Sequence, residues 1–187
     1  ENTYNESIRR IRRMEKPVIG AINGVAAGAG ANIALACDLT IAKASVKFIQ
    51  AFSKIGLIPD SGGTWMLPRL VGMQRAAAMA FFGEPVLASE AEAIGLIYKS
   101  VDDEVFDEEV ASIALRLASL PTYGIGLTKK AISDSADFGC PSVIAFNGFK
   151  YKNAEDPKSG EISLEKGAKN TIRGLKKLAR DAEAKKV

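Results

Sequence analysis

The sequence contains no histidine. This absence excludes Ser-His-Asp and Cys-His nucleophile systems and most zinc and haem sites, because all of these use an imidazole group. Cysteine is almost as rare, since Cys37 and Cys140 stand far apart and form no CxxC motif. Such cysteine usage predicts a reducing compartment and no structural zinc site. We therefore expect no metal centre and a cytoplasmic location.

An excess of charge of one sign is also lacking. Among the 187 residues, 25 Lys and Arg offset 22 Asp and Glu, and the net charge of +3 is too small to indicate nucleic-acid binding by itself. The stretch from Ser163 to Val187 holds eight Lys or Arg against three Asp or Glu, in an amphipathic helical pattern. A solvated helix face is favoured there over a nucleic-acid or membrane surface. We expect neither a nucleic acid nor a membrane as partner.

Long runs of Leu and Phe are absent as well. The one extended apolar run, Val18–Cys37, has only Asn23 and Asn32 as polar side chains, and glycines recur at every fourth position from Gly20 to Gly28. This pattern resembles a transmembrane helix with a packing motif. We reject that interpretation because an Asn-Gly pair is typical of turns and the run is built from weakly apolar Ala and Gly. The charged segment 1–15 also lacks the apolar core of a signal peptide.

What is present is an order of strand-turn-helix units followed by helices. The periodicity predicts strands over Val18–Ile22, Leu39–Ala42, Ala44–Gln50, Ile55–Ile58 and Leu96–Val101. It predicts helices over Tyr4–Met14, Ala31–Ala36, from Asp60 or Ser61 to about Pro68, Gln74–Phe82, Ala88–Ile94 with Ser89 as cap, Asp103–Leu120, Tyr123–Ser133 and Ser163–Lys186. This order indicates an α/β layered core and a helical C-terminal part.

A glycine-rich turn, Gly28-Ala29-Gly30, stands between a strand and a helix. It matches a dinucleotide fingerprint poorly, because Ile33 occupies the last glycine position and no acidic residue ends the next strand. Two interpretations stay open. The turn could serve close helix–strand packing, or its unpaired N–H groups could form half of an oxyanion-binding site.

Asp60 also has two interpretations. On the residues alone, an Asp before Ser-Gly-Gly is favoured as a helix cap. The apolar lead-in of Ile55, Leu57 and Ile58 instead favours a carboxylate at the end of a buried segment. Burial there would make it a usable proton shuttle, facing the glycine-rich turn.

A family resemblance is carried by three ordered motifs, KPVIGAINGVAAGAGANIALACDLTIA, FIQAFSKIGLIPDSGGTWMLPRLVG and ASEAEAIGLIYKSVDD. Over about residues 16–133 the sequence resembles the enoyl-CoA hydratase/isomerase (crotonase) superfamily, and GLIPDSGGTW resembles its isomerase-like members. The resemblance implies a spiral of β-β-α units, with C-terminal helices used for trimer formation. We therefore expect a crotonase-like core over residues 1–133, a divergent helical region over 134–187, and a homotrimer or hexamer. The amino-terminal strands of the family, which carry the first oxyanion loop, have no counterpart here.

The resemblance also implies roles for single residues. Ala29 corresponds to the residue whose N–H binds the thioester oxygen, and Gly28 and Gly30 shape that turn. Asp60 corresponds to the carboxylate that isomerase-like members use. The two hydratase glutamates are replaced by Asn32 and by Phe52.

Pocket walls are expected from Phe52, Ile58, Pro59 and Trp65, although core packing is the favoured interpretation of such apolar residues. The activity implied is isomerisation of an unsaturated or ring-epoxide acyl-CoA through an enolate, with no cofactor besides the coenzyme A of the substrate. The alternatives are an enoyl-CoA hydratase or acyl-CoA hydrolase of the same superfamily, or a non-catalytic module that binds CoA or serves assembly.

Overall fold

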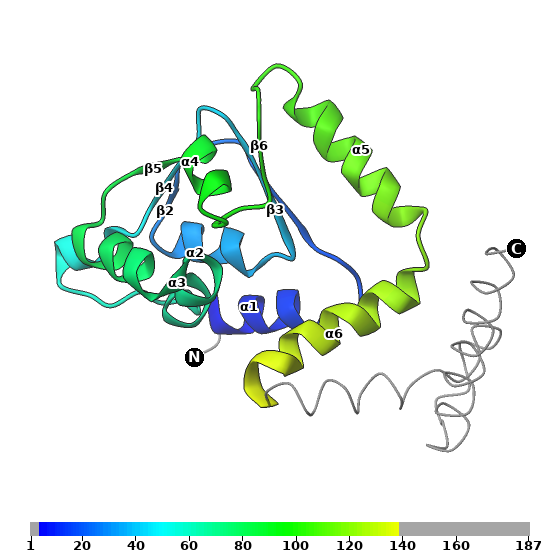
Figure 1. The fold of residues 1–187 in the computed structure, drawn as a ribbon, viewed down its shortest axis with the longest axis horizontal. Helices are drawn as coiled ribbons and strands as arrows, with labels where there is room; N and C mark the ends of the chain where they lie inside the picture. The colour runs from blue at the N-terminus through cyan, green and yellow to red at the C-terminus, as the bar shows by residue number, and fades with distance from the viewer. Residues whose placement is uncertain (1–3, 139–187) are drawn as a thin grey trace, which may run out of the picture. The chain divides into compact units, whose positions relative to one another are not determined.

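The computed structural model describes residues 4–138, and for Tyr4 and residues 136–138 it describes the backbone only. The helices of this part are α1 (Tyr4–Arg13), α2 (Ala29–Ala36), the 3-10 helix η1 (Ala51–Ile55), α3 (Gly63–Phe82), α4 (Ala88–Ala93), α5 (Phe106–Ala118) and α6 (Thr122–Phe138) (Figure 1). Its strands are β1 (Ile19–Ile22), β2 (Ala26–Ala27), β3 (Leu39–Lys43), β4 (Lys47–Ile49), β5 (Val86–Leu87) and β6 (Lys99–Val101). The helix expected over Ser163–Lys186 lies outside the described residues, and the domain boundary expected at residue 133 stays a prediction.

The strands form two three-stranded sheets that the chain visits in turn. One sheet has the order β1-β3-β6 and is parallel throughout, and the other has the order β2-β4-β5 with β4 and β5 antiparallel. The chain lays β1 and β2 in different sheets before α2, and β3 and β4 in different sheets before η1 and α3. The first two turns therefore each add one strand to each sheet and then a helix, which is the β-β-α spiral expected from the sequence (Figure 1). In the third turn α4 stands between β5 and β6, and α5 follows.

Helix α2 lies at the centre of the main hydrophobic core and packs against α1, α3, β1 and β2. Its side chains there are small: Ala31 and Ala36 are fully buried and Ala34 is 4% exposed. Because alanine lets neighbouring backbones approach closely, several elements can surround one short helix. Leu35 is the large buried side chain that α2 itself adds to this core. The other large side chains come from the surrounding parts of the chain, namely Val46, Phe48, Met66, Leu67, Val71, Met79, Val86, Leu96 and Ile97.

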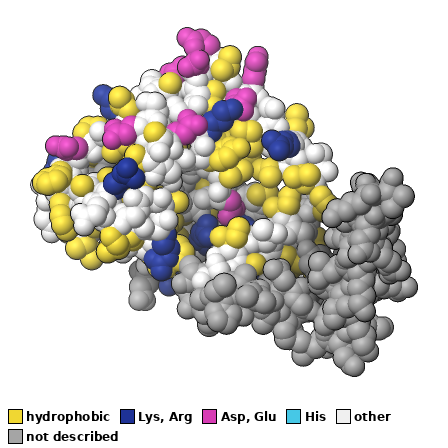
Figure 2. All heavy atoms as spheres, viewed as in Figure 1, with side chains coloured by type: hydrophobic (Ala, Val, Ile, Leu, Met, Phe, Trp, Pro, Cys, Tyr) yellow, Lys and Arg dark blue, Asp and Glu magenta, His cyan; other side chains and the backbone are white. Residues whose placement is uncertain are grey.

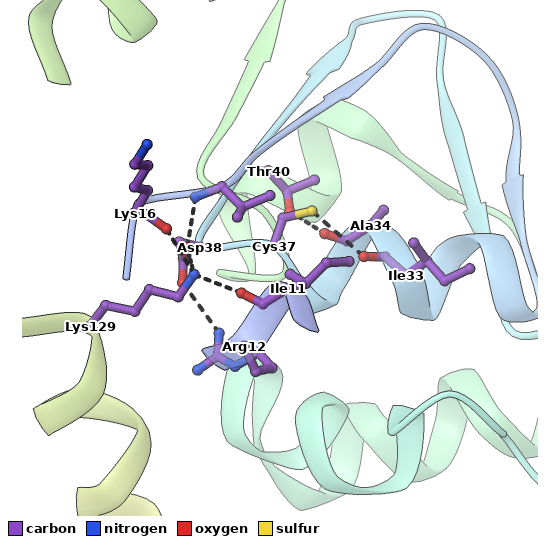
Figure 3. A network of polar contacts seen from close by, with 10 residues as sticks. Ile11, Arg12, Lys16, Ile33, Ala34, Cys37, Asp38, Thr40 and Lys129 are labelled. Atoms are coloured by element: carbon purple, nitrogen blue, oxygen red, sulfur yellow. Dashed lines mark hydrogen bonds and ion pairs between the residues drawn. The ribbon is translucent and has the colours of Figure 1, made fainter. Parts of the chain in front are cut away.

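A partly buried ion pair connects the N-terminal elements to the first half of α6 (Figure 3). The Lys129 ammonium lies 2.6 Å from an Asp38 carboxylate oxygen and also donates to the carbonyl oxygens of Ile11 (2.7 Å) and Lys16 (3.1 Å). The same carboxylate accepts a bond of 2.8 Å from the Val18 amide at the entrance to β1. The pair is therefore fully hydrogen-bonded, which a buried charge requires to be tolerated.

Several expected element boundaries were wrong. The segment Ile55–Ile58 is not a strand, because η1 runs to Ile55 and Gly56 then turns the chain at a φ of 72°. The two helices expected to about Pro68 and over Gln74–Phe82 are confirmed as the two halves of α3, which Gly72 separates with a φ of 77° and a ψ of 163°. Only the end of the first half was misplaced, because it passes Pro68 and reaches this break. Gly62 precedes this helix as its cap in place of an Asp60 or Ser61 side chain.

Three shorter corrections concern the middle of the chain. Ser89 lies inside α4 and does not cap it, since Leu87 is the residue before the helix. The strand expected over Leu96–Val101 is shorter and consists of β6 alone. The two-residue strands β2 and β5 were missed, because a run of two residues is too short to show an alternation of apolar and polar residues.

By length and composition, no single helix of residues 4–138 could span a membrane, although α5 and α6 pass that test as a bent pair.

The Lys129–Asp38 pair leads to a stability prediction. Lys129→Met should lower the free energy of unfolding by about 1–3 kcal/mol, because the carbonyl oxygens of Ile11 and Lys16 lose their side-chain donor. The Asp38 carboxylate loses its 2.6 Å partner and keeps only the Arg12 guanidinium at 3.5 Å and the Val18 amide. Lys99→Met is the matched control, since Lys99 pairs with Glu109 at 2.6 Å on a more exposed surface, where ion pairs contribute little. Urea unfolding measures both variants, and equal losses would contradict the assignment of Lys129 as a structural anchor.

Candidate functional site

The glycine-rich turn leads directly into the first turn of α2. Gly28 has a φ of 54°, a conformation that favours glycine, and α2 begins at Ala29. The Gly28 amide donates to the Ile49 carbonyl oxygen at 2.8 Å, which extends the pairing of β2 with β4. Ala29, half-buried, is the first helical residue, so its N–H has no partner within the helix. The local geometry can therefore present a backbone donor to a ligand.

Asp60 lies in a tight backbone turn before α3. Its carbonyl oxygen accepts a hydrogen bond of 2.8 Å from the Gly63 amide. Between them Ser61 and Gly62 have φ values of 48° and 80°, so two consecutive residues adopt the left-handed region. Such a conformation is costly for Ser61 and persists only when the surroundings hold it.

The environment of Asp60 differs from the expectation. Asp60 is exposed, and the segment before it is exposed as well, with Ile55 at 71%, Leu57 at 59% and Ile58 at 79%. The expected burial of the carboxylate in an apolar segment was therefore wrong. The physical reason is that the run Ile55–Ile58 forms no strand in residues 4–138, so no sheet pairing among these residues buries it.

A buried amide chain connects α2 to the Asp60 turn. Asn32 Nδ2 donates to the Asp60 carbonyl oxygen at 2.8 Å, and Gln50 Nε2 donates to Asn32 Oδ1 at 2.8 Å. Asn32 is fully buried and Gln50 is 1% exposed. Asn32 lies one helical turn after Ala29, so this contact holds the Asp60 turn beside the first turn of α2. The structure thus brings the two elements that carry Ala29 and Asp60 together.

Gly63 completes this contact. A Cβ on Gly63 would collide with the Asn32 amide nitrogen and lie 2.7 Å from Asn32 Cγ, so the amide packs directly on the glycine backbone. Sequence reasoning missed Gln50 and Gly63, and it read Asn32 only as a replacement. A signal was available: an Asn inside an alanine-rich, buried helix must find hydrogen-bond partners, because burial without them is costly.

The expected wall residues divide into two groups. Phe52 is buried, and its ring lies 3.6 Å from where a Cβ on Gly28 would stand, so it packs against the glycine-rich turn. Ile58 is exposed and Pro59 is half-buried. Trp65 is 37% exposed beneath the Arg69 guanidinium, which lies 4.1 Å from the ring centre. Their roles as pocket walls stay predictions.

Large apolar side chains are exposed around η1 and the C-terminal end of α3. Figure 2 shows hydrophobic atoms over the region where Figure 1 draws the cyan segment and α3. The residues are Ile55, Leu57, Ile58, Phe81 and Phe82. Gly83, which ends α3, contacts this segment, because a Cβ there would lie 2.9 Å from the Gln50 carbonyl oxygen. The residues just before the Asp60 turn are therefore exposed apolar side chains.

The groups with shifted pKa values lie outside this site. Burial, followed by the nearby Asp38 charge, raises the pKa of the Cys37 thiol. Hydrogen bonds from Ser45 hold the pKa of the Asp103 carboxyl below its usual range. Within residues 4–138, no group of three His, Cys, Asp or Glu side chains could hold a metal ion.

The sequence profile described as Enoyl-CoA hydratase/isomerase matches residues 1–169. The 1,2-epoxyphenylacetyl-CoA isomerase of Escherichia coli K12 is 50% identical over 135 residues, which are 72% of this chain and 52% of that protein. A probable enoyl-CoA hydratase of Rhodobacter capsulatus is 45% identical over 142 residues, 76% of this chain and 55% of that protein.

Solved structures agree with the profile. The crystal structure of a probable enoyl-CoA hydratase/isomerase from Mycobacterium abscessus superposes with a TM-score of 0.74 at 39% identity, covering 78% of this chain and 56% of that chain. The chain thus spans about half the length of the curated relatives described above.

The close contact of Asn32 with Gly63 predicts an unusual sensitivity to a single methyl group. Gly63→Ala should lower the free energy of unfolding by about 1–3 kcal/mol, because the Asn32 amide is held from both sides and cannot move away. Gly24→Ala is the matched control, since a Cβ on Gly24 meets nothing within 4 Å. Thermal unfolding monitored by circular dichroism compares the two, and a neutral Gly63→Ala would show that the amide is not held in place.

Proposed function

This chain belongs to the enoyl-CoA hydratase/isomerase family, and we propose that within it the chain acts as an acyl-CoA isomerase. One observation carries the proposal: the 2.8 Å bond from Asn32 to the Asp60 carbonyl oxygen, which holds a carboxylate-bearing turn beside the first turn of α2. A single acid and a backbone donor then come from neighbouring elements. This is the minimum that moving a proton on a thioester requires.

The proposed reaction needs one carboxylate and a stabilised enolate. Asp60 takes a proton from a carbon of the acyl chain, and the electron pair of that C–H bond moves toward the thioester oxygen. The Ala29 N–H donates to the oxygen as it becomes negative, with Gly28 and Gly30 shaping the turn. Asp60 then returns the proton to another carbon, so a double bond or a ring epoxide is rearranged and no atom is gained or lost.

Hydration is the second candidate, and the names of relatives such as the Rhodobacter capsulatus protein favour it. The residues at the two hydratase positions argue against it. Asn32 uses both ends of its amide in bonds to Asp60 and Gln50, and Phe52 is a buried hydrocarbon ring. Neither side chain can give or take the protons of an attacking water.

The substrate proposal follows from similarity. The 50% identity to a 1,2-epoxyphenylacetyl-CoA isomerase supports a ring-epoxide acyl-CoA as the first compound to assay. The coenzyme A belongs to the substrate, and we propose no further cofactor. A homotrimer or hexamer, suggested by the family resemblance, is the assembly we propose.

Asp60→Asn tests the acid. We expect the isomerase rate with 1,2-epoxyphenylacetyl-CoA or a 3-enoyl-CoA to fall by about 10²- to 10⁴-fold, because an amide cannot accept the proton. Asp107→Asn, an exposed acid on α5, serves as the control and should keep the wild-type rate. Robust addition of water to a trans-2-enoyl-CoA that survives Asp60→Asn would sink the isomerase assignment. Binding of acetyl-CoA in calorimetry without any turnover would support a binding module instead.

Ala29→Pro tests the backbone donor. Proline is favoured at the first position of a helix, so the substitution removes the Ala29 N–H with little cost to α2. We expect the isomerase rate to fall by about 10²- to 10³-fold, the typical effect of losing one oxyanion donor. Ala29→Ser keeps the N–H and should stay near the wild-type rate. Equal rates for the two folded variants would show that this amide does not hold the oxyanion.

A further inference from the structure

We propose that Asn32 is the positioning residue for Asp60, acting through the backbone and not on the substrate. Its side-chain amide, oriented by Gln50, fixes the turn from Asp60 to Gly63 and so sets where the carboxylate stands. The inference rests on the proposed function, because it gives Asp60 the catalytic part. It assigns a purpose to a polar residue at a position where a hydratase would carry a glutamate.

The orientation of the amide pair is determined by the backbone. The Asp60 carbonyl oxygen can only accept, so the Asn32 Nδ2 group must face it. Oδ1 then points the other way and takes the proton of Gln50 Nε2 at 2.8 Å. Asn32 is fully buried and Gln50 nearly so, which keeps water from competing for either bond. The chain of bonds therefore has a single direction, from Gln50 to Asp60.

The turn needs such an external hold. Ser61 stands at a φ of 48°, which is unfavourable for a residue with a side chain, and its hydroxyl oxygen is buried with no hydrogen-bond partner among residues 4–138. Its own side chain thus supplies no bond that would keep the turn. Two bonds meet at the Asp60 carbonyl oxygen, one from Asn32 Nδ2 and one from the Gly63 amide, each 2.8 Å long. The Gly62 carbonyl oxygen accepts from the Trp65 and Met66 amides of α3, so of these bonds only the one from Asn32 comes from a distant part of the chain.

The backbone and the carboxylate of Asp60 have different surroundings, and we assign them different roles. The carbonyl end is fastened to the buried amide, whereas the residue as a whole is exposed. The carboxylate is therefore available to a substrate while its backbone is held. A loss of the tether should affect the rate of the chemical step more than the binding of CoA, because small errors in placement cost about 10²-fold in rate.

The experiment compares three variants of the full chain. Asn32→Leu removes the donor at every pH with a side chain of similar size. Asn32→Asp keeps an acceptor for Gln50 but turns a carboxylate oxygen toward the Asp60 carbonyl. Thr40→Val is the matched control, because Thr40 is also buried and loses one bond of 2.7 Å to the Ala34 carbonyl oxygen, with no contact to the turn (Figure 3). The measurements are kcat and KM with 1,2-epoxyphenylacetyl-CoA, and amide hydrogen exchange at Gly63.

We expect Asn32→Leu to lower kcat by about 10- to 100-fold with little change in KM, and to speed exchange at Gly63. Thr40→Val should leave both at the wild-type level. Asn32→Asp should resemble Asn32→Leu at high pH and recover as the pH falls. The reason is that the neutral form of a buried carboxyl regains an O–H that can donate to the Asp60 carbonyl oxygen. The rates are taken per folded molecule, because ionisation of a buried carboxyl also lowers the stability of the fold.

The proposal is overturned if Asn32→Leu keeps the wild-type kcat and the wild-type exchange at Gly63, or if Thr40→Val lowers kcat as much. Should Asn32→Leu fail to fold, Asn32→Asp decides: a kcat that does not change with pH relative to the wild type overturns the proposal. An inactive wild-type chain would contradict the proposed isomerase, and exchange at Gly63 would then still test whether Asn32 holds the turn.

Discussion

The side-chain amide of Asn32 is the contact on which the arrangement of the candidate site depends. It lies in the middle of the core, where an unpaired polar group would be costly, and both of its ends are satisfied, by Gln50 and by the Asp60 carbonyl oxygen. Its partners come from separate parts of the chain, 18 and 28 residues away. Three elements therefore share one small polar network, and none can move alone without leaving a buried group unpaired.

The core around this amide is built to let such a contact form. Helix α2 is made largely of alanine, so the β1 strand and the α3 helix both approach it closely. Gly63 brings the start of α3 so near to α2 that a Cβ at this position would collide with the Asn32 amide. A bulkier α2 would hold these elements apart and break the bond to Asp60. Small residues in this protein thus serve polar geometry as well as apolar packing.

A second polar contact, between Lys129 and Asp38, has a different purpose. It connects α1, the residues before β1 and the first half of α6 near the C-terminal end of α2. Each of the two charged groups also forms hydrogen bonds with the backbone. The two networks flank the two ends of the same helix. One fixes the C-terminal side of α2, and the other fixes the turn that faces its first residues. Helix α2 therefore positions both the N-terminal elements of the fold and the turn that carries Asp60.

The sequence by itself determined the family, the spiral of strand-strand-helix units, the start of α2 at the glycine-rich turn, and the pairing of Ala29 with Asp60 as a hypothesis. These depend on local patterns and ordered motifs, which one sequence displays. Only the tertiary structure decided that the run Ile55–Ile58 is exposed, that α3 passes Pro68, and that Asn32 bonds to the Asp60 backbone. The physical reason is that burial and hydrogen-bond partners are set by contacts between residues distant in the chain. An apolar run has the same sequence pattern whether it is buried or exposed in the folded protein. The sequence around an amide side chain likewise does not show which distant group it will bind.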